Sequence, residues 1–260
     1  LQDQLARALG GFYDSSNEDD LKSWIERSEK AVDAKRYVPL GNVAYVVGHL
    51  LRQKTHIDVK YWREKLIEYA GDQNENGVLQ RHALFALQHL EDPTVIEELP
   101  NLMDSEELIQ QTFLELCASL APDHPKSLEY FFEGVSRDNI YGRLGLTEAK
   151  RPSTMKRILR EFNDSESFRS EFLEQSFVFK DKDAILIENI EAGYDEEIAE
   201  LVKTAVIKCL HYNYAHSALE SAFIKGLWKL LKRKDPDGFL PEIVDRIKAG
   251  GESDVYYAAA

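Results

Sequence analysis

Apolar residues recur at three- and four-residue spacing along nearly the whole chain, and alternating strand patterns are scarce. This spacing places apolar side chains on one face of an α-helix, which turns once in about 3.6 residues. Residues 95–120 show the pattern, with Asp104 or Ser105 as the N-cap at a corner between two helices. The apolar positions are Ile96, Leu99 and Met103 on the first helix, then Leu108, Phe113, Leu116, Cys117 and Leu120 on the second. The pattern predicts an all-α protein.

The same helix–corner–helix unit recurs at intervals of 28 to 32 residues. Equivalent positions in five successive units are Val78, Leu108, Ile140, Phe168 and Ile198. A helix pair of this length cannot bury its apolar stripe alone, so neighbouring pairs are expected to stack into a continuous core. The sequence therefore predicts an α-α superhelix, a solenoid of antiparallel helix pairs.

Prolines mark the expected breaks between units, because proline is tolerated just after one helix or in the first turn of the next. They occur in Glu91-Asp92-Pro93, in residues 121–125, in Arg151-Pro152-Ser153 and in residues 235–238. We expect one helical-repeat domain over residues 1–260. Its predicted parts are capping helices in 1–60 (at 18–34 and 40–53), pairs in 61–216, capping helices in 217–250, and a tail in 251–260. The chain opens on Leu1 and closes on three alanines, so we expect it to be a piece of a longer protein.

The 28–32-residue units resemble HEAT or armadillo-type repeats over about residues 60–215, with LMDSEELIQQTFLELCASL as the corner and second helix of one unit. Several units lack the Asp-then-Arg or Lys pattern common in the second helices of that family, so the repeats are degenerate. The resemblance implies a curved right-handed superhelix whose second helices line a concave surface. It implies no particular ligand.

Charge is unevenly distributed over a chain with 32 basic and 46 acidic residues and a net charge of −14. Such a charge disfavours non-specific binding to nucleic acid or anionic membranes. Residues 91–107 carry seven acidic residues and no Lys or Arg, whereas residues 137–160 carry a local charge of +5. If the arginines of this basic segment share one face, they suit a phosphate or an acidic peptide. The candidate partner-binding residues are Arg137, Tyr141 as an aromatic anchor, Arg143, Arg151, Arg157 and Arg160.

Chemistry-bearing residues gather in KCLHYNYAH, residues 208–216, but Cys209, His211 and His216 cannot converge from one helix. Cys209 is expected to pack as a small apolar side chain, and His82 to lie at a helix interface. Tyr212, Tyr214 and His216 either cover the next helix or meet a partner. No metalloprotease, phosphate-loop, dinucleotide or nucleophile-elbow motif is present, and the glycines of YGRLGL suit close helix packing. We expect no catalytic residue, metal or cofactor.

Two functions follow from these patterns. The first is a non-enzymatic scaffold, adaptor or regulatory module that binds a protein or acidic peptide. The second is a nucleic-acid-binding or DNA-repair protein that uses residues 137–160. With two cysteines, no signal peptide and no apolar run near the roughly 20 residues of a membrane span, we expect an intracellular, cytoplasmic protein without a membrane segment.

Overall fold

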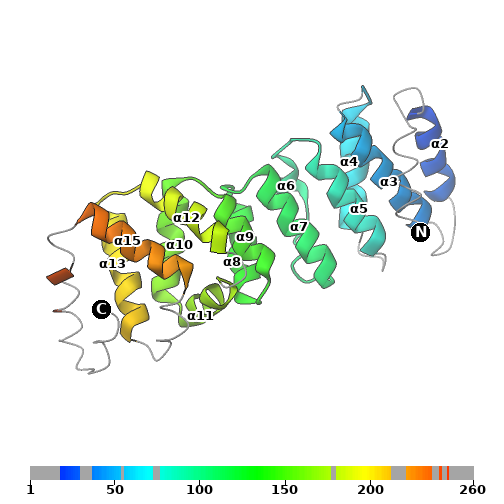
Figure 1. Ribbon diagram of the computed structural model, residues 1–260. Coiled ribbons are helices and arrows are strands. Elements are labelled where there is room, and N and C mark those ends of the chain that lie inside the picture. Colours follow the sequence, from blue (N-terminus) through cyan, green and yellow to red (C-terminus); the bar gives the residue numbers. More distant parts are fainter. Residues whose placement is uncertain are drawn as a thin grey trace. The chain divides into compact units, whose positions relative to one another are not determined.

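The computed structural model describes residues 18–29, 37–53, 56–72, 77–176, 180–211 and 221–235, together with positions 240, 241 and 245. Within these residues we delimit thirteen helices and find no strand, so the all-α prediction is confirmed (Figure 1). The chain divides into two compact units, Leu1–Ala121 and Pro122–Ala260, where the sequence predicted one domain. The boundary falls inside the predicted repeat region 61–216.

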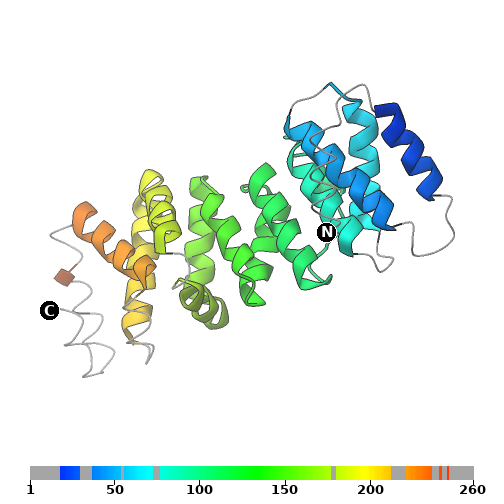
Figure 2. The same ribbon diagram turned by 45° about the vertical axis from the view of Figure 1, so that its right-hand side comes forward.

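Unit 1 contains six of these helices, and its helices two apart in the chain run side by side in the same direction. They are α2 (Glu18–Glu29), α3 (Tyr37–Arg52), α4 (Val59–Gly71), α5 (Gly77–Gln88), α6 (Val95–Glu98) and α7 (Glu107–Leu120). Glu18 of α2 accepts a hydrogen bond from the Trp62 indole of α4 (2.9 Å), and Glu29 accepts one from the Tyr69 hydroxyl (2.8 Å). Gly48 of α3 lies so close to α5 that an added Cβ would meet Ala86 at 3.0 Å. Figure 2 shows this group from a second side.

In unit 2 the helices that lie side by side in the same direction are three apart in the chain, whereas in unit 1 they are two apart. The helices are α8 (Pro125–Ser136), α9 (Ile140–Glu148), α10 (Pro152–Asp164), α11 (Glu166–Gln175), α12 (Lys180–Ala192), α13 (Glu196–His211) and α15 (Ala222–Lys234). Helix α8 packs against α11, α9 against α12, α10 against α13, and α12 against α15. Figure 1 shows α9, α12 and α15 following one another within this unit.

Individual contacts fix this three-helix period at close to 40 residues. The Asn189 side chain of α12 donates to the Ala149 carbonyl at the end of α9 (3.0 Å), 40 residues away. Asn163 of α10 donates to the Leu201 carbonyl of α13 (2.9 Å), 38 residues away. The predicted 28-residue shift, which made Phe168 equivalent to Ile140, is therefore wrong in this unit. It found matches because any two amphipathic helices share a three- and four-residue spacing.

The YGRLGL glycines allow α8 and α9 to pack closely, as predicted. An added Cβ at Gly142 would meet the Phe131 carbonyl oxygen at 2.7 Å, and one at Gly145 would collide with the Phe131 ring. The expected first-turn prolines are also present, at the start of α8 and α10. The Asp123 carboxylate accepts hydrogen bonds from the backbone of Lys150 and Arg151 (both 3.1 Å), and so connects the residues before α8 to the residues before α10.

The corner of residues 95–107 differs from its prediction. Helix α6 ends at Glu98 because Leu99 precedes a proline and is extended, with φ −70° and ψ 140°. The next helix begins at Glu107 with Glu106 as its N-cap, so neither Asp104 nor Ser105 has that role. Leu108 is 52% exposed rather than in the core.

Two tryptophans of unit 1 differ in exposure. Trp62 is buried, whereas Trp24 is 42% exposed because Leu21 and Ile25 form the buried face of α2. Among the helices that the structure describes, none has both the length and the apolar character needed to cross a bilayer.

Candidate functional site

The basic segment 137–160 is largely neutralised by carboxylates of unit 2. Four of its seven cations have an acidic partner: Arg137 with Glu133, Arg143 with Asp183, Lys156 with Asp195 and Glu197, and Arg160 with Glu197. Arg137 pairs within the end of α8, and the other three cations pair with carboxylates at or just before the start of a neighbouring helix. The segment is therefore much less cationic than its sequence indicates.

Arg143 is not at the surface, which corrects its assignment to a partner-binding site. Its side chain is 0% exposed and pairs with Asp183, which is 1% exposed. The guanidinium lies over the Phe172 ring, 4.3 Å from its centroid, and Asp183 also accepts a hydrogen bond from Ser176 (2.5 Å). Burial raises the pKa of Asp183. The pair connects α9 to α12 inside unit 2.

The other predicted partner-binding residues do not form one ridge. Arg157 is exposed and lies over the Phe132 ring of α8 (4.6 Å), whereas Arg160, one turn later, pairs with α13. Arg151 is exposed at the N-cap of α10. Tyr141 is half-buried in the first turn of α9, and Arg137 follows α8. The side chains of α10 thus point to two different neighbouring helices.

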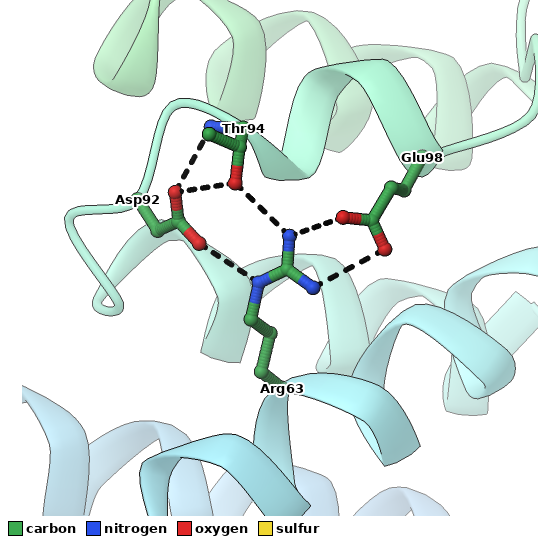
Figure 3. A network of polar contacts seen from close by, with 4 residues as sticks. All are labelled: Arg63, Asp92, Thr94 and Glu98. Atoms are coloured by element: carbon green, nitrogen blue, oxygen red, sulfur yellow. Dashed lines mark hydrogen bonds and ion pairs between the residues drawn. The ribbon is translucent and has the colours of Figure 1, made fainter.

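The acidic segment 91–107 is held to α4 by one arginine. Arg63 donates to Asp92 (2.8 Å), to the Thr94 hydroxyl (3.0 Å) and to both carboxylate oxygens of Glu98 (2.5 and 3.2 Å), as Figure 3 shows. Both carboxylates raise the pKa of Arg63. The pKa of Asp92 is lowered, first by its hydrogen bond from Thr94 and then by Arg63. This network fixes α6 and the residues just before it against α4.

A second set of side chains lies along α3, α5 and α7; Tyr45 and His82 are its buried members, and the others are half-buried or exposed. On α5 it occupies positions i, i+4, i+7 and i+11, which share one face of a helix. We call it the α3–α5–α7 face and define it by Tyr45 and His49 of α3, Val78, His82, Phe85 and His89 of α5, and Leu108 and Glu115 of α7.

Aromatic and imidazole rings form the centre of this face. The Tyr45 ring lies 5.2 Å from the Phe85 ring in a stacked arrangement, and 4.7 Å from His49. Phe85 also meets His89 edge to face at 4.9 Å. Beneath them His82 is buried and its Nδ1 lies 2.8 Å from the Gly41 carbonyl oxygen, in agreement with the predicted helix-interface histidine. The rings therefore form one continuous layer over α3 and α5.

Large apolar side chains continue the face toward the starts of α5 and α7. Val78 is 41% and Leu108 52% exposed, while Phe85, His49 and His89 are half-buried. Burial lowers the pKa of His89, with smaller contributions from the nearby Arg52 and His49, so its imidazole is neutral at pH 7. Aromatic rings and exposed aliphatic side chains in one patch are typical of protein interfaces.

Glu115 is the one acidic residue of the face. Partial desolvation raises the pKa of the Glu115 carboxylate. No cation among the described residues pairs with it. It differs in this from Asp92, Glu98 and Glu197, which all have cationic partners. A carboxylate in such surroundings favours the approach of a cation.

The sequence did not predict this face, because Val78 and Leu108 were assigned to the repeat core. A signal was present: α3 and α5 carry a second apolar and aromatic stripe opposite the buried one. A helix that is apolar on two sides has two neighbours to contact.

The segment KCLHYNYAH, residues 208–216, lies only partly within the described residues. Cys209 is 2% exposed, and burial raises the pKa of its thiol to about 12, so it packs as a small apolar side chain as predicted. Tyr212, Tyr214 and His216 lie outside the residues that the structure describes. In the described part of the chain, no group of three His, Cys, Asp or Glu side chains is placed to hold a metal ion.

Comparison with protein-family models, with curated proteins and with solved structures finds no match to this chain.

Proposed function

We propose that this chain is a non-enzymatic α-solenoid module of the HEAT or armadillo type. It acts as a scaffold, adaptor or regulatory module that binds a protein partner through the α3–α5–α7 face. The parallel packing of helices two apart in unit 1 and three apart in unit 2 supports the solenoid arrangement. Separations of 38 and 40 residues also match the repeat length of about 40 to 47 residues in that class.

The observation that carries the binding function is the exposure of Val78 and Leu108 beside the Tyr45–Phe85 ring layer. The core of unit 1 does not need these side chains, since Leu79, Leu84 and Leu114 fill the opposite sides of α5 and α7. Binding of a partner that removes these apolar groups and the neighbouring aromatic rings from water is favoured by the hydrophobic effect.

The basic segment is a weaker site for a partner. Arg143 is buried, and Arg137 and Arg160 already pair with carboxylates. Phosphate contacts would have to displace the carboxylates from Arg137, Lys156 and Arg160, which leaves few cations of the segment for nucleic-acid binding. We therefore assign the partner to the α3–α5–α7 face and not to Tyr141 and its neighbouring arginines.

A pair of matched variants tests this assignment. Val78→Glu with Leu108→Glu alters the face, and Trp24→Glu with Val59→Glu is the control, because those residues are equally exposed (42% and 49%) in the same unit. A photoreactive phenylalanine analogue at Phe85 is used to crosslink the 260-residue chain to proteins of its source cells.

We expect one dominant crosslinked species, which the face variant loses and the control variant retains. Circular dichroism checks that both variants keep the helical content of the wild type. Equal crosslinking by the wild type and by the face variant would refute the proposed function.

A further inference from the structure

The surroundings of the α3–α5–α7 face are strongly acidic. Residues 77–121 contain eight Asp or Glu and a single Lys or Arg, which is Arg81. Arg63 of α4 compensates only Asp92 and Glu98 of these eight. An apolar patch within such a field attracts cationic partners and repels polyanions.

The placement of the charges within the patch is specific. Glu115 is on the same outward side of α7 as Leu108, two turns further along, and its carboxylate has no cationic partner among the described residues. Glu106 and Glu107 precede Leu108 at the start of the helix, and both are exposed. Carboxylates therefore stand at both ends of the exposed part of α7.

We propose that the partner presents a cationic amphipathic segment, with apolar side chains seated between Val78, Phe85 and Leu108 and a Lys or Arg that pairs with Glu115. This inference rests on the proposed function. The segment belongs to a protein and not to a nucleic acid or an anionic membrane, because Glu106, Glu107 and Glu115 are exposed at the start and along the outward side of α7 and would repel phosphate groups. A Lys or Arg at Glu115 supplies the charge that this carboxylate lacks within its own chain.

A displayed library of random 16-residue peptides serves as the probe, with the immobilised 260-residue chain as the target. Peptides that also bind the Val78→Glu, Leu108→Glu variant are removed first. We expect the recovered peptides to combine apolar residues with an excess of Lys and Arg over Asp and Glu.

Affinities of the recovered peptides are then measured for two charge variants. Glu115→Lys should weaken them by about tenfold or more, since it replaces an attraction by a repulsion within one interface. Glu64→Lys is the matched control, because Glu64 is exposed on α4 in the same unit. The control should change affinity by less than about threefold at 0.15 M salt.

The outcomes separate this inference from the function on which it rests. Face-dependent peptides without a cationic excess, or with an affinity that Glu115→Lys leaves unchanged, overturn the inference and leave the interaction face in place. If no peptide distinguishes the wild type from the Val78→Glu, Leu108→Glu variant, both fail.

Discussion

The buried ion pair of Arg143 and Asp183 offers the most direct test of how unit 2 is stabilised. One terminal nitrogen of Arg143 donates to Asp183, while its Nε and Nη1 have no hydrogen-bond partner among the residues that the structure describes. Asp183 also accepts from Ser176, which lies 2.8 Å from the Ser221 hydroxyl. The pair thus connects α9 to α12, but it leaves two buried N–H groups unsatisfied.

Arg143→Met should lower the free energy of unfolding of unit 2 by about 3–5 kcal/mol, because it leaves a buried carboxylate without its cation. The double variant Arg143→Met, Asp183→Leu removes both charges and both unsatisfied N–H groups. Replacing a buried pair by apolar side chains is often neutral or stabilising, but Asp183→Leu also removes the acceptor of the Ser176 hydroxyl and of the Phe223 N–H. We therefore expect the double variant to be more stable than Arg143→Met and less stable than the wild type.

Urea unfolding measures these differences in unit 2 alone if Trp228 is the reporter. The chain has three tryptophans, and Trp24 and Trp62 belong to unit 1. Both are replaced by phenylalanine in every variant, which leaves the unit 2 signal unobscured. A cost below about 1 kcal/mol for Arg143→Met, or a double variant as unstable as the single one, would refute this reasoning.

Four further predictions concern other parts of the chain. Gly142→Ala should destabilise unit 2 by about 1–3 kcal/mol in the same urea assay, because the new Cβ meets backbone atoms at 2.7 Å; an unchanged midpoint would contradict the close packing of α8 and α9. Cys209 should react with a thiol reagent at pH 8 only after denaturation, because burial raises the pKa of its thiol to about 12; rapid labelling of the native protein would contradict this. Arg63→Lys should lower the thermal midpoint of unit 1, followed by circular dichroism, because an ammonium cannot reproduce the forked contacts of the guanidinium. Glu115→Gln should raise the stability of unit 1 at pH 7. Because the folded pKa of Glu115 is raised, its unfavourable contribution grows as pH rises above its unfolded pKa of about 4.3, and the variant should lose that pH dependence.

Local periodicity was sufficient to predict helices and many buried positions. Leu84 of α5, and Leu114 and Cys117 of α7, each lie on the apolar face that the spacing predicts for their helix, and all three are fully buried. Proline and glycine positions were equally informative: Pro152 begins α10, and the Gly145 position admits the Phe131 ring. These features depend on a few neighbouring residues, which is why a single sequence reveals them.

The order in which helices pack was not predictable in the same way. The choice between a period of two helices and one of three depends on contacts such as Asn189 with Ala149, which are 40 residues apart and carry no local signature. For the same reason the pairing of Arg160 with Glu197 was invisible in the sequence, and the basic segment was taken for an exposed cationic surface. Charges can be counted from a sequence, but their partners depend on the fold.

The stacking of α9, α12 and α15 sets the size of the insertions and deletions that unit 2 tolerates. Deleting the chain from the start of α11 to the end of α13 would bring α15 onto α9, in the place that α12 now occupies. Deleting two helices instead of three would place side by side helices that do not pack against each other now. It would also separate residues that pair three helices apart, such as Asn163 of α10 and Leu201 of α13. Unit 2 can therefore lengthen or shorten during evolution in whole steps of about three helices, each step preserving the faces that the remaining helices present to one another.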